Sequence, residues 1–179
     1  MKLGTKTLSL MLLLAASSVA QKYTAQGELI LPGDYRSWIF LSSGIGMTYS
    51  NNANEHPRFG NVFVNPEAYK AFTKTGTWPD KTYLIIETRA SDSRPSNKEG
   101  KFQTQLTGFE AHVKDASHGG WMFYEFKPET HTAKPFAKQE VCTSCHDKNT
   151  AVDKTFVQFY PTLIDIAKAH GTWHEPPAE

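Results

Sequence analysis

The feature that most constrains this 179-residue chain is a pair of cysteines near its C-terminal end. Cys142 and Cys145 are its only two cysteines, and His146 follows directly in the stretch EVCTSCHDKNT. A structural zinc site typically takes a second pair of cysteines or a pair of histidines at set spacing, and no second cysteine pair is present. A thioredoxin-like redox motif is expected early in a βαβ pattern, whereas this pair lies late in the chain.

The remaining interpretation is covalent attachment of haem. In a C-x-x-C-H motif the two thiols form thioethers with the porphyrin edge, and the histidine gives an imidazole nitrogen to the iron. The motif therefore predicts one haem c held by Cys142 and Cys145, with His146 as a ligand of the iron. An isolated disulfide is the alternative, but the ring closed by C-x-x-C is so small that it stabilises a fold little.

The N-terminal residues favour the haem interpretation because they have the pattern of an export signal. Lysines precede a short apolar run, Leu8 to Ala16, and small residues lead up to Ala20. The run is too short to span a bilayer as a permanent helix. Residues 1–20 are therefore predicted to be a cleaved signal peptide, and residues 21–179 a single periplasmic domain with no membrane span.

The overall charge narrows the range of partners. The formal net charge is +1 and the sequence pI is about 7.8, without a basic stripe or an acidic tail. Nucleic acid is therefore not an expected partner. Hydrophobic residues make up 39% of the chain and aromatic residues 12%, which is ample for one buried core.

The hydrophobic periodicity in the middle of the chain is mostly that of strands. The β-rich stretches are NVFVN, TYLIIETRA, KFQTQLTGFEAHVKD and WMFYEFK. The simplest arrangement is an antiparallel meander on one sheet, in a mainly β fold of the α+β class. The polar stretch from Ser91 to Lys101 is expected to be an exposed loop. The sequence does not show the long amphipathic helices that a four-helix bundle such as cytochrome c′ requires.

Two helices are expected beside the sheet. The stretch NPEAYKAFTKTG has Asn65 as N-cap, Pro66 at the first helical position and Gly76 as a stop, and Lys74 lies in its last turn. The second helix is predicted in DKTFVQFYPTLIDIAKAHG, after the C-x-x-C-H motif, where Pro161 is expected to bend it or divide it.

Four blocks of the sequence resemble cytochrome P-460 and its relative cytochrome c′-β, which are periplasmic mono-haem proteins with a mostly antiparallel β fold. The blocks are LPGDYRSWIF, VFVNPEAYKAFTKTGTWPDKT, TGFEAHVKDASHGGWMFYEF and CTSCHDKNTAVDKTFVQFYPTL, in this order along the chain. The resemblance implies one haem with His146 as its proximal ligand, an open distal side, and a homodimer.

In the cytochrome P-460 branch the resemblance also implies a covalent link from a lysine to a meso carbon of the porphyrin. The block AYKAFTKTG places that lysine at Lys74, with Lys70, one helical turn earlier, as the second candidate. The helix dipole alone also explains a lysine in the last turn. In the cytochrome c′-β branch the link is absent, and the haem binds nitric oxide beneath an apolar cap.

The residues themselves agree with an open distal side. An electron carrier usually fills the sixth position of the iron with Met or His, and no candidate here stands in a recognisable ligand motif. The possible sixth ligands are Met47, Met122, His56, His112, His118, His131, His170 and His174.

Two further residues are candidates for the site. In WMFYEFK the strand period puts Glu125 on one face with Trp121 and Phe123. If that face is buried, desolvation would raise the pKa of Glu125 and let it accept a proton, the role that the resemblance implies for a distal carboxylate. Arg36 is expected to bind a haem propionate or a neighbouring carboxylate through paired hydrogen bonds, or else to form a simple ion pair on the surface.

Two classes of function follow. The first is an enzyme that oxidises hydroxylamine to nitrous oxide, with Glu125 and Lys74 as catalytic residues and an external electron acceptor such as a soluble cytochrome c. The second is a protein that captures nitric oxide without turnover. A simple electron-transfer cytochrome is the third possibility.

Overall fold

The computed structural model describes residues 22–48 and 56–177. The predicted signal peptide, residues 1–20, lies outside the described residues. Within them, no helix is both long enough and apolar enough to cross a bilayer.

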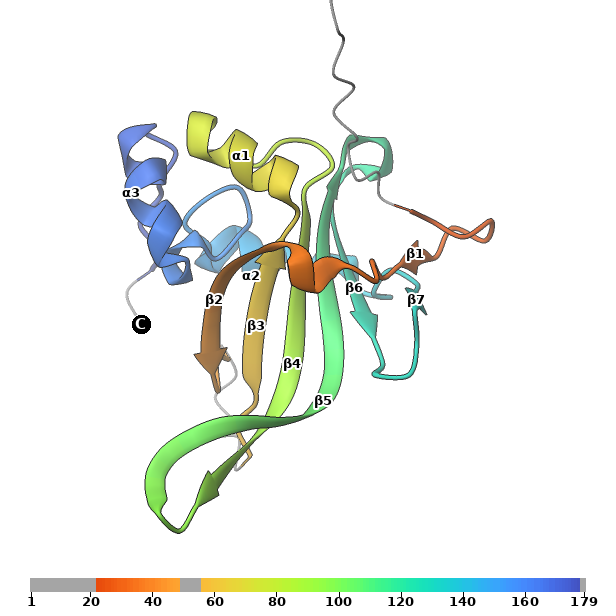
Figure 1. The fold of residues 1–179 in the computed structure, drawn as a ribbon. Helices are drawn as coiled ribbons and strands as arrows, with labels where there is room; N and C mark the ends of the chain where they lie inside the picture. Colours follow the sequence, from red (N-terminus) through yellow and green to blue (C-terminus); the bar gives the residue numbers. More distant parts are fainter. Residues whose placement is uncertain (1–21, 49–55, 178–179) are drawn as a thin grey trace, which may run out of the picture.

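A five-stranded antiparallel sheet forms the centre of the molecule (Figure 1). Its strands follow one another in chain order, so the predicted meander and the mainly β class are confirmed. A two-stranded sheet pairs β1 (Leu29–Ile30) with β7 (Thr132–Ala133). The strands of the large sheet are β2 (Ile39–Ile45), β3 (Phe59–Val64), β4 (Tyr83–Arg94), β5 (Asn97–Asp115) and β6 (Gly120–Phe126).

Helix α1 (Pro66–Thr75) joins β3 to β4 and has the predicted ends. Pro66 stands at its start, where a missing N–H removes no helical hydrogen bond. Gly76 ends it in the left-handed conformation, with φ of 72°, and its N–H donates to the Phe72 carbonyl. The side chain of Asn65 makes no cap bond; its Oδ1 accepts from the Tyr83 N–H and so fixes the helix to β4.

The expected loop from Ser91 to Lys101 is wrong. These residues belong to the ends of β4 and β5, which pair down to Arg94 and Asn97 and form the long curved hairpin in Figure 1. Almost all of its side chains are exposed or half-buried. Polar composition marked the solvent exposure correctly, but backbone pairing needs no buried face when the partner strand is adjacent.

The helical C-terminal part and α1 together cover one side of the sheet. Helix α2 (Gln139–Asn149) carries the C-x-x-C-H motif and was not expected from the sequence. The predicted second helix is divided: a short 3₁₀ turn, η3 (Val157–Phe159), precedes α3 (Pro161–Ala169). Pro161 occupies the first turn of α3, so it starts the helix there.

The two faces of the sheet pack against different layers. The face with Leu84 and Phe123 joins a core with α1, α3 and the segment around Val152. The opposite face, with Ile85 and Tyr124, joins a core with the N-terminal segment, where Tyr35 and Trp38 are buried. We call these the helix face and the N-terminal face.

Candidate functional site

Helix α2 places both cysteines on one side, because they stand one turn apart. Both are partly buried, and neither forms a disulfide. Burial raises the pKa of the Cys142 thiol. Asn149 donates to the carbonyl of Cys145 at 2.9 Å and approaches its sulfur at 3.5 Å. The pair is therefore arranged to bind one neighbouring group through two sulfurs.

The ring of His146 is held in one tautomer. Its Nδ1 lies 2.7 Å from the carbonyl oxygen of Lys154, and a carbonyl only accepts, so Nδ1 carries the proton. Nε2 then keeps the lone pair that a metal ion needs. Burial, assisted by the neighbouring His112, lowers the pKa of His146 to about 4, so the ring is neutral at neutral pH.

Three rings surround the imidazole of His146. The centroids of Phe123, Phe156 and His112 lie 4.5, 4.8 and 4.9 Å from its own. They come from β6, from the segment before η3, and from β5, so three separate parts of the chain fix the plane of the ring. Only 7% of His146 is exposed.

A second histidine and a carboxylate join this cluster. His112 Nε2 lies 3.7 Å from Glu110 Oε2. The nearby His112 lowers the pKa of Glu110. Sequence reasoning considered His112 only as a sixth ligand and missed Glu110. The available signal was their alternation in a strand, which puts both side chains on one face.

Glu125 lies on the same face of the sheet but outside the cluster. It pairs with Glu110 in the register of β5 and β6, two residues beyond Phe123. The face itself is buried at Trp121 and Phe123, whereas the Glu125 side chain is exposed. The desolvation on which its predicted proton-accepting role depended is therefore not found, and its position keeps it near Glu110 only.

Lys74 and Lys70 both lie on the exposed side of α1. The end of α1 that carries Lys74 is fixed to the C-terminal segment, because Thr172 Oγ1 donates to the Gly76 carbonyl at 2.7 Å. No described contact joins either lysine to α2. The protein residues alone thus do not bring Lys74 to the cysteines.

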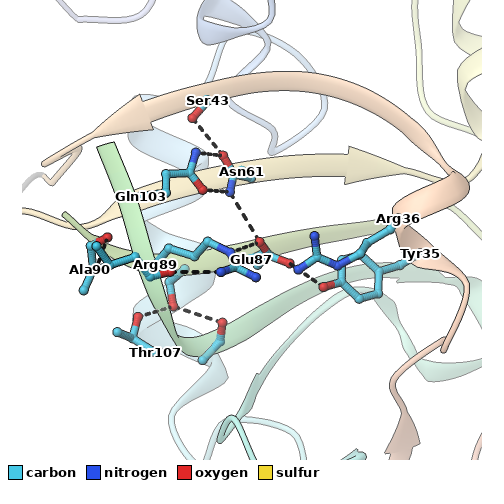
Figure 2. A network of polar contacts seen from close by, with 12 residues as sticks. Tyr35, Arg36, Ser43, Asn61, Glu87, Arg89, Ala90, Gln103 and Thr107 are labelled. Atoms are coloured by element: carbon cyan, nitrogen blue, oxygen red, sulfur yellow. Dashed lines mark hydrogen bonds and ion pairs between the residues drawn. The ribbon is translucent and has the colours of Figure 1, made fainter. Parts of the chain in front are cut away.

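Arg36 lies on the N-terminal face, on the other side of the sheet from His146. Its Nη2 is 2.5 Å from Glu87, whose second oxygen is 2.5 Å from Arg89 Nε (Figure 2). Tyr35 donates its hydroxyl to the same carboxylate, and Asn61 lies 3.5 Å away. Of the two partners considered for Arg36, the structure shows the neighbouring carboxylate.

The pKa of Glu87 shows how complete this pairing is. Glu87 is only 1% exposed, and burial by itself would raise its pKa. The hydrogen bonds from Tyr35 and Arg89, with the charges of Arg36 and Arg89, instead lower the pKa below its usual value. Glu87 is thus a charged, fully paired group.

Among the described candidates for a sixth ligand, only His112 packs against His146, and it does so edge-on against the imidazole ring itself. His118 pairs with Asp115 and stacks on Tyr23. Met122 packs against the N-terminal core. The remaining described candidates are Met47, His56, His131, His170 and His174, all of them exposed.

The donor set of α2 fits a haem of the c type. Two free thiols share one side of a helix, and the next residue has a neutral ring whose Nδ1 is bonded and whose Nε2 has a lone pair. Fold and site together define a mainly antiparallel β protein with a haem-attachment motif on a helix.

The family can be stated more narrowly. The family model for cytochrome P460 matches residues 32–157, more than two thirds of the chain, including the C-x-x-C-H motif. The chain therefore belongs to the cytochrome P460 family, whose members are haem proteins associated with hydroxylamine oxidation. A search of curated proteins found no match.

Proposed function

We propose that this chain is an exported haem c protein that oxidises hydroxylamine. The observation that carries the proposal is His146, whose Nδ1 is bonded to the Lys154 carbonyl while Nε2 stays available beside two free thiols. Membership of the cytochrome P460 family supports the nitrogen substrate. The signal-like pattern of residues 1–20 supports a periplasmic location.

The proposed reaction balances with an external oxidant. Two molecules of hydroxylamine give one nitrous oxide, one water, four protons and four electrons, and a soluble redox protein such as a cytochrome c accepts the electrons. Haem, when bound, supplies an iron that takes a nitrogen ligand and passes electrons on. Cys142 and Cys145 would hold that haem, and His146 would bind its iron and keep one orientation.

Two other residues have roles in the proposal. Glu125 accepts a proton from the substrate, since closure of the site by haem would reduce its exposure to water. Lys74 would form a further bond from Nζ to a meso carbon of the porphyrin: the C–N bond replaces the meso C–H bond and one N–H bond, two protons leave, and an external peroxide takes the two electrons. Such a bond would distort the ring and so change its properties. We also propose that the protein acts as a homodimer, as the resemblance to its family implies.

Nitric oxide capture without turnover is the second candidate. It is favoured by the exposure of Glu125 to solvent and by the half-buried apolar side chains of Val62 and Ile86 in the same row of the sheet. An apolar distal wall with no active base would bind a small neutral ligand without oxidising it.

Variants of the two lysines test the link. Lys74→Leu is expected to give an ordinary c-type spectrum in the ferrous protein and little nitrous oxide from hydroxylamine. Lys70→Leu, one turn earlier on the same exposed side of α1, is the matched control and is expected to resemble the unchanged protein. A tryptic map in which the Lys74 peptide is free of haem contradicts the assignment.

A pair of carboxylate variants separates oxidation from capture. Glu125→Ala is expected to slow hydroxylamine oxidation by about a hundredfold. The control is Glu129→Ala, which removes an exposed acid beyond the end of β6 and is expected to leave the rate unchanged. If neither the unchanged protein nor any variant produces nitrous oxide, but the ferrous form binds nitric oxide, the second candidate is correct.

A further inference from the structure

The carbonyl that orients His146 belongs to an unusual turn. Val152 and Thr155 form an isolated bridge around it, and the Thr155 N–H donates to the Val152 carbonyl at 2.8 Å. The two central residues, Asp153 and Lys154, have φ of 45° and 57°. Both are left-handed without being glycine, a conformation that persists only when surrounding contacts enforce it.

Residues of the sheet hold the left-handed turn in place through contacts with the Asp153 carboxylate. Lys114 Nζ lies 2.7 Å from one oxygen, and Trp121 Nε1 donates to the other at 3.2 Å. Lys114 also donates to the Trp78 carbonyl at 2.7 Å, so its ammonium group is held in place. The turn is thus tied to β5 and β6 through a single side chain.

On its outer side the turn borders an open hollow of about 510 Å³. On the inner side, Trp78 Nε1 donates to Thr155 Oγ1 at 2.7 Å and fixes the end of the turn. The residues that line the hollow are Thr77, Lys114, Val152, Asp153, Gly171, Thr172 and His174.

We infer that Asp153 is a positioning residue for the axial ligand. It acts on His146 through the backbone, because the carbonyl that accepts the Nδ1–H bond belongs to Lys154, the residue that follows Asp153. This role rests on the proposed function, in which His146 Nε2 binds haem iron. Lys114 on β5 and Trp121 on β6 hold the Asp153 carboxylate. Through it, these polar contacts set the orientation and the donor strength of the His146 imidazole.

The consequence of releasing the turn follows from the hydrogen bond. A firm Nδ1–H bond makes the imidazole a stronger donor to a metal ion. Without the Asp153 contacts, the two left-handed residues relax, the carbonyl moves away, and the bond lengthens. The imidazole then binds iron more weakly and is free to change its plane.

Asp153→Gly is the sharpest variant. Glycine keeps the left-handed backbone accessible, so the variant is expected to fold, but both sheet contacts are lost and the turn is no longer held in one position. Resonance Raman spectra of the ferrous protein are expected to show the iron–histidine stretch at lower frequency, and hydroxylamine turnover is expected to fall about tenfold or more. Lys114→Met removes the ion pair from the other partner and is expected to shift the stretch in the same direction. Asp153→Asn keeps an acceptor for Trp121, so its shift is expected to be smaller.

Asp147→Asn is the matched control. Asp147 is adjacent to His146 and pairs with Lys154 Nζ at 2.5 Å, but it makes none of the contacts of Asp153. Its removal changes the charge near the ligand and is expected to leave the stretch in place. An unchanged stretch in both Asp153→Gly and Lys114→Met, or an equal shift in Asp147→Asn, overturns the role of Asp153.

A haem-stained denaturing gel of the unchanged protein separates the two proposals. Covalent haem with an unchanged stretch in the variants overturns only the role of Asp153. A chain that never acquires covalent haem contradicts the proposed function and, with it, this role.

Discussion

The two faces of the central sheet differ in whether their buried titratable groups have all their hydrogen-bond partners. On the N-terminal face, the buried Glu87 is satisfied from all sides by Tyr35, Arg36 and Arg89. On the helix face, the buried His146 uses one ring nitrogen for the Lys154 carbonyl and keeps the other available. Because buried polar groups are normally paired, the first arrangement stabilises the fold and the second indicates a site for a ligand.

The comparison also separates two residues that the sequence made candidates for one site. Arg36 and Glu125 both stand in blocks that resemble the family. The strand register places Arg36 beside Glu87 on one face and Glu125 beside Glu110 on the other. Substitutions should therefore divide into two groups, those that change stability and those that change the haem.

The largest expected effect is the loss of both cysteines. Replacing Cys142 and Cys145 together with serine removes the only thiols of the chain, so no thioether forms and hydroxylamine turnover is abolished. Haem staining after denaturing electrophoresis checks this result. The control replaces two exposed lysines with glutamine: Lys138 at the N-cap of α2 and Lys148 in its last turn. This variant is expected to keep the haem stain. Persistent covalent haem in the serine variant would contradict the site.

Glu87→Gln is expected to have the largest effect on the other face. It leaves Arg36 and Arg89 without their buried carboxylate, and removing one partner of a buried ion pair costs about 3 kcal/mol. Urea unfolding measures the loss, with Glu129→Gln as an exposed control that stays within about 0.5 kcal/mol. The ferrous spectrum of the folded variant should not change. A spectral change with little loss of stability would mean that Glu87 belongs to the haem site.

Acid should remove the stability that the paired carboxylates of the N-terminal face provide. The pKa values of Glu87 and Asp115 both lie below their ordinary values of 4.5 and 3.8, because hydrogen bonds and cations outweigh the effect of burial. The unfolded chain therefore binds more protons than the folded one, so stability is present above these ordinary values and falls as the pH drops below them. Unfolding free energies measured between pH 7 and pH 3 check this.

The same titration distinguishes Glu87 from the rest of the chain. Glu87→Gln should flatten the loss of stability below pH 4.5, since glutamine has no proton to gain. Glu129→Gln should keep the full slope. Equal slopes in both variants would show that the Glu87 carboxylate contributes no stability through its charge.

Arg36→Gln is expected to have the smallest effect. The Arg36 side chain is 58% exposed, and Arg89 remains beside Glu87, so the loss should be about 1 kcal/mol. Thermal unfolding measures it, and the haem spectrum and hydroxylamine turnover should stay unchanged. Altered haem properties would restore the propionate as a partner of Arg36.

Much of the fold was predictable because its signals are local. Pro66 and Gly76 mark the ends of α1, and the alternation in WMFYEFK gives β6. The C-x-x-C-H motif by its spacing alone predicts Cys142, Cys145 and His146 as the residues that hold haem. The polar hairpin around Arg94 was missed because its pairing depends on the neighbouring strand and not on a buried face.

The surroundings of His146 were not predictable from local signals. The Lys154 carbonyl reaches the ring through a turn whose left-handed residues, Asp153 and Lys154, are not glycine. The contact with His112 depends on the register of β5 and β6 and on the docking of α2. Such long-range geometry has no spacing signature in the sequence.

The most direct test of the central claim is the intact mass of the denatured wild-type protein, purified from cells that mature c-type cytochromes. Attachment through Cys142 and Cys145 predicts one species heavier than the processed polypeptide by one haem. A tryptic map is expected to show the haem on the CTSCH peptide, joined also to the Lys74 peptide where the lysine link has formed. A species with the mass of the polypeptide alone would contradict the assignment of α2 as the haem site.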